Sequence, residues 1–329
     1  MLSSGAATDE PLKVKLEFDF RVGRSYVYSV SSSRYVKAEI SQPVFWQTDR
    51  QISKVVRRTD EGSFLIQTNM EKERQKRNVV IAYFRVKYPT FQTEITRDGR
   101  MKIPPRQPFP QVRNVPIFPA YAVGEGDKWV VEDVSFYPGG LTQEVNADWE
   151  YELIEFVRHN GYSCAHIEAI GTVNFENEPV TLAFLGFYPD PLSKEPGAFI
   201  GTLVPDSPVA IAGFLAGDKI LRIDGVRIKD WWELPELLPY LPPEEEITVE
   251  IERDGEKSEI SFKTGSIELA TASGSGTFKF DIYFGVNAGH IISMDGRTDN
   301  LTIHLVNEES QETKEITSSV HMEFLPEGN

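Results

Sequence analysis

The chain has 329 residues, of which 40% are hydrophobic and 26% charged, fractions that are ordinary for a globular protein with room for two or three domains. Its one cysteine, Cys164, excludes an intramolecular disulfide and any metal site built from several cysteines. No apolar stretch approaches the length of a membrane span, and the formal net charge is −16.

The first ten residues, MLSSGAATDE, have neither a basic region nor an apolar core. They are not a signal peptide, although the sequence could begin just after one, and we expect residues 1–10 to be disordered. The chain that follows predicts β structure, because short segments rich in β-branched and aromatic residues alternate with turn signals. Before residue 180 these segments span residues 16–32, 64–70, 79–88, 91–103, 129–137, 151–157 and 163–171.

A weak internal duplication runs through these strands. Gly23-x-x-Tyr26 and Gly126-x-x-Trp129 each begin a strand, and a Val-Arg pair before a glycine-closed hairpin turn follows each of them at a similar distance. The pattern predicts two related antiparallel units packed into one barrel or sandwich. Chance similarity between β hairpins is the alternative.

The two units differ in charge. Residues 1–113 hold 21 Lys/Arg against 12 Asp/Glu, whereas residues 114–182 carry a formal charge of −10. Acidic residues interrupt the densest basic clusters, which are Arg57-Arg58 and residues 71–77, so the sequence does not predict nucleic-acid binding. Complementary surfaces between the units, or simple solvated faces, explain the pattern.

A series of short motifs begins at residue 183. Gly186 lies between Leu185 and Phe187, and consecutive backbone N–H groups in such a turn can hold a carboxylate. An apolar run of strand length follows at residues 198–204. Ser207 then caps a short helical turn that has proline at its first position and ends at Gly213.

The series continues with a strand at residues 219–225, a helix at 231–241 and two alternating strands within 246–262 that Asp254-Gly255 joins. In this order the motifs of residues 183–265 resemble the PDZ domains attached to bacterial envelope proteases, while the flanking β domain resembles no family that we identify. The resemblance implies a β fold with two short helices. It also implies a groove that binds an extended or C-terminal peptide as an added strand.

The resemblance assigns the groove to two segments. The carboxylate loop and the strand after it supply Leu185, Gly186, Phe187 and Tyr188, and one face of the helix supplies Glu233, Leu237 and Tyr240. Pro189 and Pro191 depart from the family pattern, because a proline has no N–H for a peptide strand. A PDZ fold kept as a spacer or an intramolecular contact is therefore the alternative.

Strand signals resume after the PDZ-like segment, at residues 274–306 and 316–325, with 278–284 as the clearest strand. They predict a discontinuous all-β domain of residues 11–178 plus 274–326, with a PDZ domain at 180–266 inserted into it. Residues 176–179 and the Ser/Gly-rich 271–276 are the expected connectors. Three consecutive domains are the competing arrangement.

Catalytic and metal-binding patterns are poor. Ser163 lies in GYSCA, which lacks the second glycine of a nucleophile elbow and follows a hairpin turn. The five histidines have no metal-ligand spacing, and no motif for a nucleotide or other cofactor is present; they are His159, His166, His290, His304 and His321.

These observations lead us to expect no catalytic residue, metal or cofactor. The leading hypothesis is a non-enzymatic protein of the bacterial envelope, periplasmic or at the cell surface, whose PDZ groove binds a peptide or a protein C-terminus. The alternative is an all-β carrier for a lipid or another apolar ligand. An unrecognised hydrolase is the exception that the sequence leaves open, and the oligomeric state is not predicted.

Overall fold

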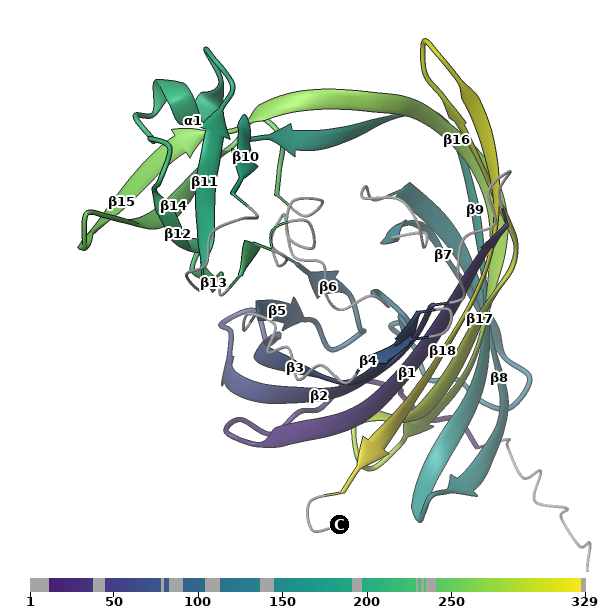
Figure 1. Ribbon diagram of the computed structural model, residues 1–329. Helices are drawn as coiled ribbons and strands as arrows, with labels where there is room; N and C mark the ends of the chain where they lie inside the picture. Colours follow the sequence, from purple (N-terminus) through teal and green to yellow (C-terminus); the bar gives the residue numbers. More distant parts are fainter. Residues whose placement is uncertain are drawn as a thin grey trace, which may run out of the picture.

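The computed structural model describes residues 12–37, 45–77, 80–82, 91–103, 113–136, 145–190, 197–228, 230–231, 234 and 241–326. It confirms the mainly β fold with a PDZ domain: antiparallel strands form one sheet of 12 strands and one of six (Figure 1). Residues 1–10, for which we expect disorder, lie outside the described residues. No helix of the described part is long and apolar enough to cross a membrane.

The large sheet takes strands from both sides of the PDZ domain. Its first group is β1 (Ser25–Lys37), β2 (Phe45–Arg58), β3 (Phe64–Arg77), β4 (Val80–Ala82), β5 (Phe91–Ile95) and β6 (Met101–Lys102). Its second group is β7 (Lys128–Phe136), β8 (Val145–His159), β9 (Tyr162–Phe184), β16 (Gly265–Gly285), β17 (His290–Val306) and β18 (Gln311–Leu325).

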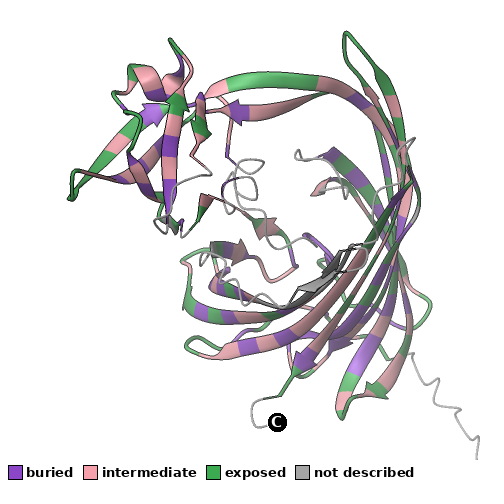
Figure 2. Cartoon of the chain, in the orientation of Figure 1, coloured by how far each residue is buried: buried purple, intermediate pink, exposed green. Residues whose placement is uncertain are grey.

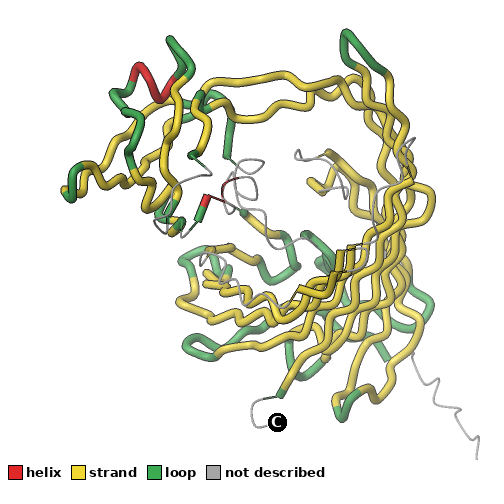
Figure 3. Tube along the Cα trace, viewed as in Figure 1, coloured by secondary structure: helices red, strands yellow, loops and turns green. Residues whose placement is uncertain are grey.

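The order across this sheet is β6-β5-β3-β2-β1-β18-β17-β16-β9-β8-β7, with β4 on β3. The last strand of the chain thus pairs with the first, from Val27↔Leu325 to Lys37↔Glu315. The strands β7, β8, β9, β16, β17 and β18 lie side by side in chain order, and β1, β2, β3, β5 and β6 follow them in chain order. The sheet thus has the order of two consecutive antiparallel units. The sheet is one strongly curved layer, as in a barrel, and not two stacked sheets (Figure 3).

The two units begin with the same turn. Gly23 and Gly126 have φ values of 84° and 81°. The Gly23 N–H donates to the Val55 carbonyl at 2.8 Å, and the Gly126 N–H donates to the Leu153 carbonyl at 2.7 Å. Equivalent bonds at equivalent strand positions support the duplication that the sequence indicates.

Backbone pairing of β1 with β18 joins the two units. At the boundary between β1 and β18 the ion pair is Lys37–Glu315 at 3.0 Å, with both side chains more than half exposed. An exposed pair of this kind contributes at most about 1 kcal/mol.

The side chain of Asn114 bridges the two edges of the curved sheet. It accepts from the Met101 N–H of β6 at 2.6 Å and donates to the Ser135 carbonyl of β7 at 3.1 Å. Ile117 follows in the same segment, and its carbonyl accepts from the Trp129 indole at 2.8 Å. A single segment thus takes the place of a strand ladder between β6 and β7.

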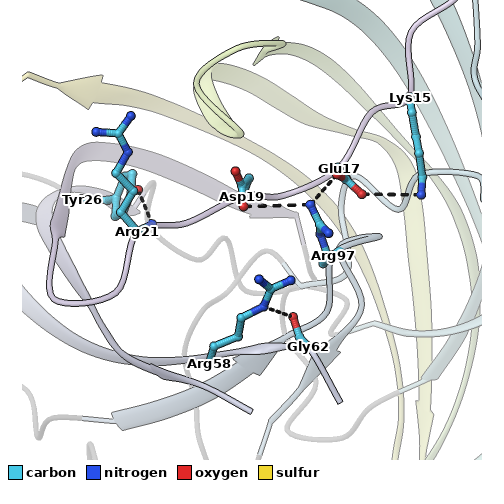
Figure 4. Close-up of polar contacts among 8 residues, drawn as sticks. All are labelled: Lys15, Glu17, Asp19, Arg21, Tyr26, Arg58, Gly62 and Arg97. Carbon is cyan, nitrogen blue, oxygen red and sulfur yellow. Dashed lines mark hydrogen bonds and ion pairs between the residues drawn. The ribbon is translucent and has the colours of Figure 1, made fainter. Parts of the chain in front are cut away.

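The core of the large sheet combines aromatic side chains with residues of two non-strand segments, 12–24 and 113–123. Buried positions recur along the strands of this sheet (Figure 2). Phe18 from the N-terminal segment packs on Phe118 and Phe284, with ring centroids 5.6 and 5.2 Å apart. On the polar side of that segment, Arg97 forms an ion pair with Glu17 (Figure 4). The segment of residues 12–24 is therefore fixed from both sides.

The PDZ sheet has the order β10-β11-β12-β14-β15, with β13 on β12. Its elements are β10 (Phe187–Pro189), β11 (Ala198–Leu203), α1 (Pro208–Ile211), β12 (Lys219–Ile223), β13 (Val226–Arg227), β14 (Glu246–Arg253) and β15 (Glu256–Lys263). Of the expected second helix, the structure describes Trp231, Leu234 and Leu241. Leu234 and Leu241 are buried in the PDZ core.

Two long strands connect the sheets. β9 and β16 pair with each other up to Phe184↔Gly265, so the expected connectors at 176–179 and 271–276 are strand and not loop. We propose that residues 11–178 and 274–326 fold as one discontinuous domain around a PDZ domain at 180–266, because β16 to β18 complete the sheet that β1 to β9 begin.

A deletion tests this domain boundary. Replacing residues 185–264 with a short Gly/Ser turn should leave a cooperatively folding β protein, because Phe184 and Gly265 are already cross-strand neighbours. Truncation after residue 182 should not, since it leaves β1 and β9 as unpaired edges. Urea unfolding followed by circular dichroism distinguishes them, and a cooperatively unfolding 1–182 fragment would show that the proposed boundary is wrong.

Candidate peptide-binding groove

Strand β10 lies at the edge of the PDZ sheet, directly after β9 ends. It pairs with β11 on one side only, through Phe187↔Leu203, Tyr188↔Thr202 and Pro189↔Ile200. An edge strand offers its outer N–H and C=O groups to another extended chain. β10 is therefore one of the two edges of this sheet, with β15, that offer backbone groups to a peptide strand.

The direction of the backbone groups along β10 follows from two hydrogen bonds. The Gly186 carbonyl accepts from the Val204 N–H, and the Asp190 N–H donates to the Phe199 carbonyl, both at 2.8 Å. Because successive residues of a strand alternate in direction, Phe187 and Pro189 point their backbone groups to the free edge. The edge thus has a donor and an acceptor at Phe187 but only an acceptor at Pro189.

The loop before β10 turns at Gly186, whose φ is 88°. A Cβ on this residue would lie 2.0 Å from the Ser207 Cβ, a distance that atoms do not reach. Leu185 is buried in the PDZ core, and its carbonyl accepts from the Val209 N–H at 3.1 Å. The loop is thus held by the buried Leu185 side chain, by the hydrogen bond to the Leu185 carbonyl and by the close packing of Gly186 on Ser207.

The predicted groove residues divide into described and undescribed sets. Leu185 is buried, Phe187 is half-buried against the PDZ core, and Tyr188 is 65% exposed. The three predicted residues of the helix, together with Pro191, lie outside the described residues; those three are Glu233, Leu237 and Tyr240. The structure therefore describes one wall of the proposed groove.

An ion pair between the buried Asp218 and the part-exposed Arg253 supports the sheet behind this wall. Asp218, with its side chain 1% exposed, contacts the Arg253 guanidinium through both oxygens at 2.6 Å and accepts from the Leu215 N–H at 2.8 Å. Burial alone raises the pKa of Asp218, but the bonds from Arg253 and Leu215 outweigh it, so this pKa lies below its ordinary value. Sequence motifs did not predict this pair, because its partners are far apart in the chain.

Of the residues considered for catalysis, His159 and His166 meet at Tyr283, on which both rings stack, with centroids 3.9 and 4.6 Å away. Ser163 is exposed near the start of β9, after a hairpin turn at Asn160 and Gly161. His290 is buried, which lowers its pKa. Among the described residues, no group of three or more His, Cys, Asp and Glu side chains could hold a metal ion.

One serine–histidine contact was not predicted. Ser293 of β17 lies 2.8 Å from His159 Nε2, and the His159 ring stacks on Tyr283 at 3.9 Å. The distance suits a nucleophile and its base. However, Ser293 is 4% exposed, and its strand pairs with Tyr283 and Glu323 on both sides, so the contact is packed within the sheet.

Comparison with known proteins identifies the domain that carries the groove. Residues 178–264 match the family model of the PDZ domain. A probable periplasmic DegP-like serine endoprotease of Marinomonas sp. (strain MWYL1) is 36% identical over 70 residues, which are 21% of this chain and 15% of that protein. The corresponding protein of Halomonas elongata is 32% identical over 74 residues, 22% of this chain and 16% of that protein.

Solved structures give a weaker likeness. The match to an HtrA-type protease, AlgW with a decapeptide, covers 72% of this chain and 95% of that chain at 13% identity and a TM-score of 0.24. The match to a serine endoprotease from Yersinia pestis covers 74% and 94% at 15% identity and a TM-score of 0.24. Scores this low support no argument about the large sheet.

These relatives correct the expected function class. We expected a non-enzymatic binding protein, but the proteins that share its PDZ domain are named serine endoproteases, so this expectation is wrong. The carrier alternative required an apolar cavity, whereas the described core of the large sheet is a cluster of buried aromatic and aliphatic side chains. The identification of residues 183–265 as a PDZ domain is confirmed, for that segment of the chain.

Proposed function

We propose that this protein has a protease-associated function in the bacterial periplasm, in which the PDZ domain captures an extended segment or a free C-terminus of another protein. The observation that carries the proposal is the β10 edge, with the Leu185-Gly186-Phe187 loop at its start. The periplasm is supported by the names of the relatives that share the domain.

In this proposal the loop binds the terminal carboxylate of the peptide through backbone N–H groups. The peptide then pairs with Phe187, and its third residue from the end meets Pro189, which accepts but cannot donate. One missing hydrogen bond costs about 0.5 to 1.5 kcal/mol, or up to about tenfold in affinity. The groove therefore reads the last two or three residues with modest affinity.

The connection between the two sheets gives the groove a defined place in the protein. β9 runs without interruption to Phe184, and the carboxylate loop begins at the next residue. Because β9 and β16 pair along this stretch, the PDZ domain is joined by a hydrogen-bonded ribbon and not by a single-stranded linker. A captured peptide is therefore presented in a fixed relation to that ribbon.

Titration of the full chain with a C-terminal peptide library tests the proposal, with each binding peptide compared with its C-terminally amidated twin. We expect micromolar or weaker binding and a loss of about tenfold or more on amidation, because the loop then lacks a charged acceptor. Equal affinity of acid and amide, or no binding by any member, would refute the groove as a C-terminus receptor.

A further inference from the structure

Ser207 lies beneath the carboxylate loop. It is 2% exposed and caps the first turn of α1, where its hydroxyl oxygen accepts from the Ala210 N–H at 3.4 Å. The same hydroxyl donates to the Gly186 carbonyl at 3.0 Å. One side chain thus connects the helical turn to the loop, twenty-one residues apart in the chain.

The Gly186 carbonyl has two donors. The Val204 N–H reaches it at 2.8 Å from the β11 side, and the Ser207 hydroxyl reaches it at 3.0 Å. A peptide unit is planar and trans, so its C=O and the N–H of the following residue point in opposite directions. Fixing the Gly186 carbonyl therefore also fixes the direction of the Phe187 N–H, toward the free edge of β10.

Packing limits the same peptide unit. The closest approach of the loop to the helical turn is at Gly186, where an added Cβ would meet the Ser207 Cβ at 2.0 Å and its Oγ at 2.4 Å. The Gly186–Phe187 unit thus rests on the Ser207 side chain. α1 has four residues and is too short to act on an anion through its own dipole, so the serine is the relevant group.

We propose that Ser207 is a positioning residue for carboxylate recognition, acting through the Gly186 carbonyl on the direction of the Phe187 N–H. The inference rests on the proposed function, since it concerns the carboxylate end of the same groove. Its specific consequence is that Ser207 contributes to the preference for a free C-terminus over an amidated one, and not to the contacts with the rest of the peptide.

The test compares full-length wild type, S207A and S207T, with S261A as control. Ser261 is exposed on β15, away from the loop, and its hydroxyl is hydrogen-bonded to Thr248 at 2.8 Å. S261A therefore also removes a hydroxyl hydrogen bond. The measured quantity is the ratio of the affinities for a binding peptide from the library and for its amidated twin. We expect S207A to lower this ratio about three- to tenfold through the acid form alone, while S207T and S261A keep it.

Loss of the cap could also destabilise the domain, so S207G serves as a second variant, because glycine replaces a cap at a cost of only a few tenths of a kcal/mol. S207G should lower the ratio as S207A does. An unchanged ratio in folded S207A or S207G overturns the role of Ser207 and leaves the groove intact. Wild type without a preference for the acid instead refutes the proposed function itself.

Discussion

Gly186→Ala is expected to destabilise the PDZ domain by about 2 kcal/mol or more and to reduce the affinity for C-terminal peptides at least about tenfold. The left-handed conformation at φ 88° costs a residue with a Cβ about 1 to 2 kcal/mol. In addition, that Cβ would lie 2.0 Å from the Ser207 Cβ, so the loop must move away from the helical turn. Thermal unfolding and peptide titration measure the two effects.

Gly255→Ala is the matched control for this prediction. Gly255 turns the chain between β14 and β15 at φ 84°, and an added Cβ there meets nothing within 4 Å. It therefore carries the backbone strain without the close contact. If both variants lose the same stability and both keep peptide affinity, the close approach of Gly186 to Ser207 has no functional weight.

Asp218→Asn is expected to cost about 1 to 3 kcal/mol of PDZ stability at neutral pH, because it breaks the hydrogen bonds of a buried carboxylate to Arg253, whose side chain is 36% exposed and partly solvated. The pair also makes the stability of the PDZ domain fall at acid pH. A carboxyl group whose pKa is lower in the folded state stabilises the fold above its unfolded pKa of about 3.9, and this contribution is lost as the pH falls through the folded value.

The stability of wild type should therefore fall more steeply than that of Asp218→Asn as the pH drops below about 4. Urea unfolding at a series of pH values measures the difference. Glu250→Gln is the control, because Glu250 pairs with Arg222 at 3.2 Å at the surface, where such a pair contributes at most about 1 kcal/mol. Parallel curves for wild type and Asp218→Asn would contradict the assigned role of the Asp218–Arg253 pair.

The PDZ domain was predictable because each of its signals is local. Ser207 as cap, Pro208 at the first helical position and Gly213 at positive φ are all as the sequence indicates. The strands of the large sheet were also predictable in kind, since their inward residues alternate. The expected position of the groove rests on the family resemblance, and its three helix residues lie outside the described part of the chain.

The glycines of the large sheet led to a wrong prediction of a loop connector. The Ser/Gly-rich stretch 271–276 has the composition of a linker, yet it lies in β16. Its glycines serve packing, because a Cβ at Gly274 would meet Phe175 at 2.7 Å and a Cβ at Gly276 would meet Leu301 at 2.8 Å. Gly296 of β17 is a similar case, because an added Cβ there would meet the Phe280 ring at 2.3 Å. Short-range sequence patterns do not distinguish a glycine that turns the chain from one that admits a neighbour.

Contacts between distant residues could also not be predicted from short-range sequence patterns. Asn114 joins Met101 and Ser135, residues on the two edge strands of the sheet, and no local pattern marks it for that role. The expected function class was also wrong, because the lack of a recognised catalytic motif does not exclude a protease-associated function, which the resemblance to PDZ domains of envelope proteases already allowed. Similarity to named endoproteases supplied that correction.

The most direct test of the central claim is a structure of the full chain with a peptide that binds from the C-terminal library. The account predicts that the peptide pairs with β10 as an added strand, with its carboxylate at the backbone N–H groups of Leu185, Gly186 and Phe187. It also predicts no bond from Pro189 to the peptide carbonyl opposite. A peptide bound away from β10, or with its carboxylate outside this loop, would contradict it.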